Sequence, residues 1–203
     1  MITNRDEVLA NALRVFARMN YEKASQTEIA KACGLSKAGL IYYYPFKQDL
    51  FVAVIDKYVF HEQNPQNKFA FTATTLAGFI DQYVTGVKTT MQRMIELLDN
   101  GDTSCGCRPN FYYIHLLVQM RLHYPDVEAK LKNVVNQNYE IWVTAIRQAQ
   151  QNGEIRPDLD TEQIASVFHQ VFIGMFFKQS FFNGLNTDEL SRQFHFIYST
   201  LKA

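Results

Sequence analysis

The stretch "CGLSKAGLIYYYPFK", residues 33–47, decides how the N-terminal part of the chain folds. Gly34 can adopt the left-handed backbone conformation that ends a helix, and Ser36 is a good N-cap for the next one. Proline disfavours helical geometry in the residue before it, so Pro45 marks the end of this second helix. The stretch therefore predicts a short helix that begins directly after a tight glycine turn.

The residues before this stretch predict a partner helix. Ser25 and Glu28 have the spacing of a capping box at the start of "QTEIAKAC", which leads into Gly34. Two short helices joined by a glycine turn form a helix-turn-helix, whose second helix enters the DNA major groove N-terminal end first. Lys37 lies at that end, within reach of a base edge or a phosphate, and Lys47 adds positive charge beside the next helix N-terminus.

Three consecutive tyrosines, residues 42–44, lie on a segment too short to bury them all. We expect some of these rings to pack against the neighbouring helices and at least one hydroxyl to face outward toward a phosphate. The same glycine-turn corner also occurs in all-helical proteins that do not bind DNA. Residues 1–61 hold eight Lys and Arg against six Asp and Glu, a net charge of +2, which is modest for a DNA-binding domain.

The rest of the chain also has helical periodicity. No segment alternates with period two for long enough to predict a strand. The polar segment around residues 61–72 contains Pro65 and suggests a domain boundary. We therefore predict an all-α protein of about nine helices, with a three-helix helix-turn-helix head (residues 1–61) and a larger body (residues 62–203). We expect the body to bind a ligand and to form a dimer.

Composition excludes several classes of protein. The 203 residues are 47% hydrophobic and 20% charged, which is typical of a globular chain, and the net charge of zero confines any nucleic-acid footprint to a local patch. No apolar run reaches the ~18 residues of a membrane span. We see no signal peptide, and the odd number of cysteines, three, fits the reducing cytoplasm.

Chemical sites are weakly indicated. Cys105 and Cys107 suggest a metal site with His115 or His123, but structural zinc sites have wider thiol spacing, and two reduced loop cysteines explain the pair better. His115 and His169 lie on mostly apolar helices, either as core histidines bonded to a neighbour or as polar anchors in a ligand pocket. No phosphate-binding glycine loop or hydrolase motif is present. We predict no cofactor, no metal and no enzyme activity. An adaptor that binds protein through a helical face remains the alternative function.

Residues 8–51 carry a family resemblance. They include the "A-x-x-x-F-A" helix, the aromatic Tyr21, the "I-A-K-A-x-G-L-S-K" corner and the "Y-Y-x-P-x-K" stretch. This segment resembles the N-terminal domain of the TetR family of bacterial transcriptional repressors. The resemblance implies a cytoplasmic homodimer that binds a palindromic double-stranded DNA operator and is released by a small molecule in its C-terminal domain.

The resemblance also implies roles for individual residues. Gln26 and Thr27 correspond to a backbone phosphate contact, and Lys37, Ala38 and Gly39 correspond to base-facing positions. Further backbone contacts correspond to Tyr42, Tyr43 and Lys47. The chain departs from the family pattern twice: Ile41 occupies the place of a phosphate-binding tyrosine, which Tyr42 could replace, and Phe46 that of a small polar residue.

The segment "QIASVFHQVFIGMFFKQSFF", residues 163–182, carries two apolar stripes at helical spacing. One stripe is enough for the core of a monomer, so the second predicts a dimer interface. The expected interface residues, including one from the last helix, are Val167, Gly174, Phe177, Phe181 and Phe194.

The body is rich in aromatic residues and methionines on the inward faces of its predicted helices. Most of them should be ordinary core, but pockets between bundle helices are common ligand sites and methionine adapts to irregular shapes. Because charges are scarce on these faces, we expect a mainly apolar or aromatic effector held by one or two hydrogen bonds. The expected ligand-binding residues are Tyr83, Met94, Tyr112, His115, Trp142, Phe168 and Phe172.

Overall fold

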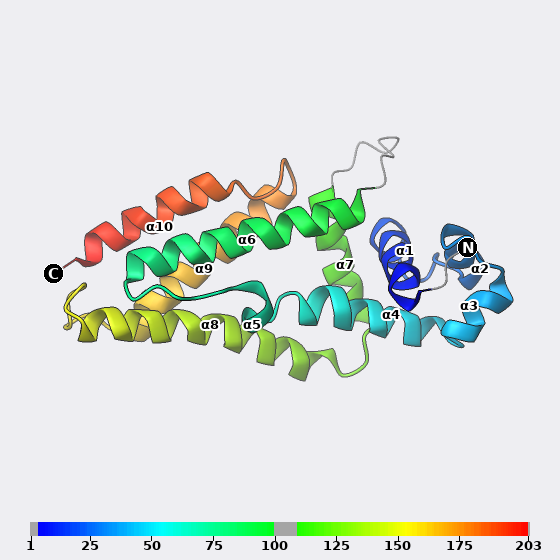
Figure 1. The fold of residues 1–203 in the computed structure, drawn as a ribbon, viewed down its shortest axis with the longest axis horizontal. Helices are drawn as coiled ribbons and strands as arrows, with labels where there is room; N and C mark the ends of the chain where they lie inside the picture. Colours follow the sequence, from blue (N-terminus) through cyan, green and yellow to red (C-terminus); the bar gives the residue numbers. More distant parts are fainter. Residues whose placement is uncertain (1–3, 100–108, 203) are drawn as a thin grey trace. The chain divides into compact units, whose positions relative to one another are not determined.

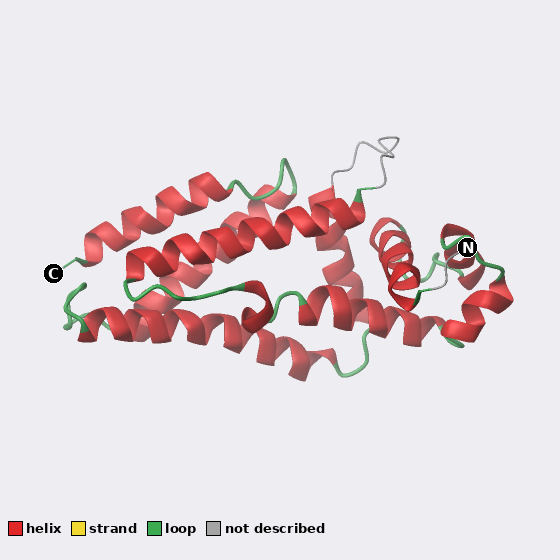
Figure 2. Ribbon diagram, viewed as in Figure 1, coloured by secondary structure: helices red, strands yellow, loops and turns green. Residues whose placement is uncertain are grey.

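The computed structural model describes residues 4–99 and 109–202. Within them the chain forms ten α-helices and one π-helical segment, η1, and no strand (Figures 1 and 2). The bounds are α1 Arg5–Arg18, α2 Gln26–Ala32, α3 Lys37–Tyr43, α4 Lys47–Ile55, η1 Asp56–His61, α5 Pro65–Lys68, α6 Leu76–Leu98, α7 Pro109–His123, α8 Val127–Gln151, α9 Thr161–Ser180 and α10 Thr187–Leu201. The all-α prediction is confirmed.

The one helix that the sequence did not predict is α5, in the polar segment interpreted as a boundary. Asn64 caps it by accepting from the backbone N–H of Gln66, and Pro65 occupies the first turn, where its missing N–H costs nothing. At four residues it is too short to show a periodic apolar stripe.

Local signals decide the ends of the first helices. The side chain of Asn4 caps α1 by accepting from the backbone N–H of Asp6. Ser25 and Glu28 form the predicted capping box of α2, and the Ser36 hydroxyl accepts from Gly39 N at the start of α3. Gly34 has φ +63°, as the turn between α2 and α3 requires.

The described chain divides into two compact units. Unit 1 contains the residues up to Glu62 together with Arg93–Leu131, and unit 2 contains Gln63–Gln92 together with the residues from Lys132 onward. The head predicted from the sequence thus shares unit 1 with the end of α6, with α7 and with the start of α8. The division into a head and a body as functional domains stays a prediction.

Unit 1 has a core drawn from α1 to α4. Leu13, Phe16, Ile29, Leu40 and Phe51 are fully buried, with the rings of Phe16 and Phe51 edge to face at 5.0 Å. Burying a large apolar side chain contributes roughly 1.5–3 kcal/mol each, so this small core fixes the orientation of α2 and α3.

Helix α7 packs against the same core from the side of α1. The His115 Nδ1 atom lies 2.8 Å from the carbonyl oxygen of Ala17. The side chain of Gln119 accepts from the backbone N–H of Tyr21 at 3.0 Å, and the ring of His123 stacks on that of Tyr21 at 4.5 Å. The last turn of α1 and the segment that joins it to α2 are therefore held by three side chains from one face of α7.

Unit 2 is built around an aromatic cluster between α6, α8, α9 and α10. Tyr83, Trp142, Phe168 and Phe194 are fully buried, one from each helix. The rings of Trp142 and Phe168 stack at 4.6 Å, and Phe194 meets Trp142 edge to face at 5.1 Å. These contacts align the four long helices of unit 2 (Figure 1).

The N-terminus of α6 is capped from a distant part of the chain. The Glu154 carboxylate, beyond the end of α8, accepts from the backbone N–H groups of Leu76 and Ala77 at 2.8 and 3.2 Å. Its Oε1 atom also accepts from the Tyr198 hydroxyl at 2.8 Å. A negative charge at a helix N-terminus is favourable, so this carboxylate joins α6 and α10 through one group.

Candidate nucleic-acid interface

The N-terminal end of α3 presents small and basic residues to solvent. Lys37 and Ala38 are exposed and Gly39 is half-buried, while Leu40 on the opposite face is fully buried. A Cβ on Gly39 would lie 3.3 Å from the Ser36 hydroxyl that caps the helix, so glycine preserves this cap. This surface therefore places a lysine beside two residues with little or no side chain, so the helix backbone can approach a base edge closely, as a recognition helix must.

The three tyrosines divide as the sequence predicted. Tyr42 is 85% exposed, Tyr43 is half-buried with its ring edge to face against that of Tyr42, and Tyr44 is buried. The guanidinium of Arg5 lies 5.0 Å from the Tyr44 ring, and its Nη2 atom donates to the Tyr43 carbonyl. Tyr42 therefore has its hydroxyl outward, and α1 holds the end of α3.

The residues expected to contact phosphates lie on α2 and α4. Thr27 is exposed, whereas the Gln26 amide donates to the Pro45 carbonyl at 3.0 Å and so links the start of α2 to the end of α3. Lys47 Nζ donates to the Tyr21 carbonyl at 2.8 Å and lies 4.2 Å from the centre of the Tyr21 ring. Lys47 is thus partly committed to the fold of unit 1, which the sequence did not indicate.

The N-terminus of α4 has no side-chain cap. Its N-cap residue, Phe46, makes no side-chain hydrogen bond to the first turn, unlike the N-cap residues of α1, α2 and α3. The first N–H groups of α4, beside Lys47, therefore have no N-cap side chain to bind. Phe46 is 70% exposed and nothing in the structure explains its large apolar ring there; Ile41 is 38% exposed on α3.

The expected ligand-binding residues belong to both units. Tyr83, Trp142 and Phe168 lie fully buried in the unit 2 cluster, and Phe172 packs partly buried against it. Met94, Tyr112 and His115 belong to unit 1, where the Arg18 guanidinium lies 5.2 Å from the Tyr112 ring. The Nδ1 atom of His115 lies 2.8 Å from a backbone carbonyl oxygen, the contact expected for one of the two roles that the sequence left open for this residue. The structure therefore brings four of the seven together.

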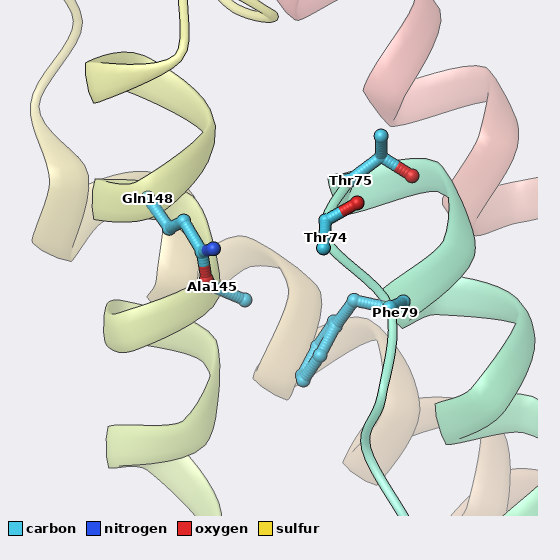
Figure 3. Close-up of a pocket in the computed structure, with 6 residues that line it drawn as sticks. Thr74, Thr75, Phe79, Ala145 and Gln148 are labelled. Carbon is cyan, nitrogen blue, oxygen red and sulfur yellow. The ribbon is translucent and has the colours of Figure 1, made fainter.

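A small pocket in unit 2 is lined by none of these residues. It has a volume of about 20 Å³, and its walls are Ala73, Thr74, Thr75, Phe79, Ala145 and Gln148 (Figure 3). A cavity needs about 10–15 Å³ to hold one water molecule, so this pocket has room for a water molecule but not for an effector.

The second apolar stripe of α9 is exposed, as the sequence predicted. Val167, Phe177 and Phe181 are 47%, 56% and 50% exposed, and a Cβ on Gly174 would meet nothing within 4 Å. Phe194 is a correction: it is fully buried, with its ring edge to face against those of Trp142 and Phe168, where it cannot reach a partner. The exposed aromatic residue of α10 is Phe196, at 67%.

Several other expectations concern absences. Among residues 4–99 and 109–202 no group of His, Cys, Asp and Glu side chains could hold a metal ion. Cys105 and Cys107 lie outside these residues. Over the same ranges, no helix is long and apolar enough to span a membrane.

Sequence reasoning missed the contribution of α7 to unit 1. Gln119 and His123 lie four residues apart and so share one helix face, but α7 is apolar on most sides and its periodicity did not show which face packs inward. Only Tyr21, an aromatic residue in a polar turn, signalled that something packs there.

The exposed end of α3, held by a glycine turn and a buried core, defines a helix-turn-helix protein with a helical C-terminal part. Two family models match the chain: "Bacterial regulatory proteins, tetR family" over residues 8–54, and "Tetracyclin repressor-like, C-terminal domain" over residues 84–193. The chain belongs to the TetR family of transcriptional regulators. This membership confirms the family predicted from residues 8–51 and the prediction that the chain is not an enzyme, and it implies binding to a DNA operator.

Solved structures show the same fold. The TetR family regulator PfmR from Thermus thermophilus superposes with a TM-score of 0.65 at 14% identity, covering 94% of this chain and 96% of its own. NalD, the secondary repressor of the MexAB-OprM multidrug efflux pump in Pseudomonas aeruginosa, gives 0.63 at 12% identity, covering 98% and 96%. At these identities the likeness concerns the fold.

Proposed function

We propose that this TetR-family regulator binds a palindromic operator as a cytoplasmic homodimer and releases it when a small, mainly apolar or aromatic effector binds to its body. The observation that carries the proposal is the exposed N-terminal end of α3, where Lys37 and Ala38 face solvent above the buried Leu40. Tyr42, the uncapped α4 N-terminus and Lys47 supply phosphate contacts around it.

The test of operator binding begins with selection from random duplexes. Lys37→Ala should weaken binding to the selected operator by ~1–3 kcal/mol and relax its sequence preference, because Lys37 reads a base edge. Lys47→Ala should weaken all duplexes about equally and lower the salt slope by about one. Because Lys47 also contacts Tyr21, its variant needs a thermal-stability measurement beside the binding data.

Lys88→Ala is the matched control, since Lys88 is an exposed lysine of α6 in unit 2. It removes the same charge and should leave both affinity and preference unchanged. If Lys37→Ala behaves like Lys88→Ala, the glycine turn between α2 and α3 has only a structural role. If no duplex binds above background in the selection, a protein-binding adaptor becomes the better hypothesis.

The exposed stripe of α9 supports a homodimer. A contiguous exposed apolar surface is unusual on a monomer, and pairing α9 and α10 with their symmetry mates buries it in a four-helix bundle. Val167, Gly174, Phe177 and Phe181 would lie at its centre, with Phe196 of α10 in place of Phe194. A dimer also spaces two α3 helices for two half-sites one DNA turn apart.

Sedimentation at micromolar concentration tests this interface. Gly174→Glu and Phe177→Glu should yield folded monomers, because each buries a charge at the interface. Gln92→Glu, on an exposed position of α6 in the same unit, adds the same charge outside α9 and α10 and should remain dimeric. Folded Gly174→Glu and Phe177→Glu variants that stay dimeric would place the interface elsewhere.

A further inference from the structure

Two polar groups in the aromatic cluster of unit 2 have no hydrogen-bond partner. Tyr83 Oη and Trp142 Nε1 are buried and unpaired, although their rings lie only 4.7 Å apart. Burial raises the pKa of Tyr83, and the nearby Trp142 N–H partly opposes this effect without the geometry of a hydrogen bond. An unsatisfied buried donor is costly and rare, so the pair points to a missing acceptor.

A cation lies against the same cluster. Lys68 Nζ, at the end of α5, lies 5.3 Å from the centre of the Phe69 ring and 5.2 Å from that of Phe172. It donates to Gln63 Oε1 at 2.9 Å, and no carboxylate among residues 4–99 and 109–202 forms an ion pair with it. Burial lowers the pKa of Lys68 to about 8. A desolvated ammonium without a counter-ion is unfavourable.

Phe69 and Phe172 join the cation to the unpaired donors. The Phe69 ring stacks on Tyr83 at 4.7 Å, and the Phe172 ring meets Tyr83 edge to face at 5.6 Å. Phe172 is only partly buried, whereas Tyr83 and Trp142 are fully buried. The cluster is therefore less closed on the side where Phe172 and Lys68 lie.

Lys68 is held in this place by its neighbours. Asn138 of α8 donates to the Gln63 carbonyl at 3.1 Å, which fixes the residue that binds the ammonium. On α6, Gly86 allows α5 to approach closely, because a Cβ there would lie 2.8 Å from the Lys68 carbonyl. Contacts from α6 and α8 thus hold the backbone at Lys68 and at Gln63, the residue whose side chain accepts from the ammonium.

The three polar groups share one chemical property. The ammonium and the indole N–H can only donate, and the tyrosine hydroxyl has a proton to donate. Apolar rings surround them. A complementary ligand would bring a negative charge and acceptor oxygens on an apolar frame, and the described protein supplies no such charge here.

We propose that the effector of this regulator is a carboxylate with an apolar or aromatic body, whose carboxylate pairs with Lys68 while its body lies against Phe172 and the unit 2 cluster. The proposal rests on the proposed function and narrows it to an anionic effector class. A carboxylate would replace water around the ammonium with a charge-assisted hydrogen bond.

The alternative is a purely structural lysine, satisfied by Gln63 and two ring faces. The two cases differ in what happens when a carboxylate is supplied. A structural lysine gives no preference between an acid and its amide, whereas a pairing lysine requires the charge.

The experiment uses matched pairs of phenylacetate, 3-phenylpropionate, hexanoate and octanoate with their primary amides, measured by thermal shift and by calorimetric titration of the full chain. We expect at least one acid to stabilise the protein and its amide to bind about 10–100-fold more weakly. Lys68→Met should lower the affinity for that acid by the same factor. Lys88→Met, which removes an exposed lysine of the same unit, should leave it unchanged.

Lys68→Met removes a partly buried charge and keeps the length of the apolar stem, so it should fold; circular dichroism and thermal unfolding check this. Equal binding of an acid and its amide, or of the acid to wild type and Lys68→Met, overturns the proposal. So does a failure of every acid in the panel to bind.

Operator binding is measured separately on the same samples. An acid that depends on Lys68 and weakens operator binding supports both the site and its role. An acid that depends on Lys68 but leaves operator binding unchanged supports the carboxylate site and overturns its role as an effector site. If the protein binds its operator but binds none of the acids, the carboxylate inference is overturned and the DNA-binding function stands.

Discussion

Replacing Gly86 by alanine is a sharp test of how unit 2 is packed. Gly86 lies in the middle of α6, where glycine is otherwise unfavourable. An added Cβ would lie 2.4 Å from Phe69 Cδ1 and 2.8 Å from the Lys68 carbonyl oxygen, well inside ordinary contact distances. The Phe69 ring stacks on Tyr83, and the carbonyl belongs to the backbone of α5, so neither moves freely.

Two effects of opposite sign set the magnitude. Alanine is a better helix former than glycine by about 1 kcal/mol, which favours the variant. Overpacking costs ~1–3 kcal/mol, and the contact with a backbone oxygen places this site in the upper half of that range. The net expectation is a loss of about 1–2 kcal/mol of unfolding free energy, or about 2–8 °C in Tm for a chain of this size.

Thermal and urea unfolding at one protein concentration measure this loss. Thr89→Ala is the matched control, because it adds an alanine at an exposed position of the same helix and should stabilise by about 0.5 kcal/mol. If Gly86→Ala is as stable as Thr89→Ala, helix propensity outweighs the steric contact, and α5 packs less closely against α6 than in the structure.

Three further predictions concern other residues. Ser25→Ala should lower the free energy of unfolding by ~1 kcal/mol, because it removes the α2 cap. The bonds to Ser25 lower the pKa of Glu28, so the contribution of Glu28 to the free energy of unfolding, measured in urea, should be lost as pH falls through that pKa. Cys33 is 1% exposed and burial raises its pKa to about 11, so peptide mass spectrometry should find it unalkylated in native protein at pH 8 and alkylated in urea; equal rates would refute its burial. Burial lowers the pKa of Lys68 to about 8 in the folded chain, so the free energy of unfolding of wild type minus that of Lys68→Met should increase as pH rises from about 8 to about 10.5; a constant difference contradicts the lowered pKa.

Local chemistry in the sequence was enough for the helix-turn-helix. Capping by Ser25 and Ser36, the positive φ of Gly34 and the break at Pro45 all depend on residues a few positions apart. A period of 3.6 residues likewise placed the long helices. The sequence also showed that α9 has two apolar stripes, because the spacing of apolar residues along one helix can be read without knowing which helices pack against it.

The sequence did not determine which surfaces those helices use. Phe194 and Phe196 are both apolar residues of α10, and only the packing of α10 on Trp142 and Phe168 buries the first and exposes the second. The sequence likewise did not show the full role of Lys47. The motif predicts that Lys47 contacts a phosphate, and in the folded chain it also donates to the Tyr21 carbonyl.

Lys68 gives the clearest case of what tertiary structure alone decided. In the sequence it is a lysine in a polar segment that follows Pro65, where a solvated side chain is the natural expectation. Its desolvation requires Phe172 of α9, more than a hundred residues away, and the close approach that Gly86 permits. The starts of α2 and α3 follow from interactions within one turn of the chain, but the environment of a charge depends on atoms that only the folded chain brings together.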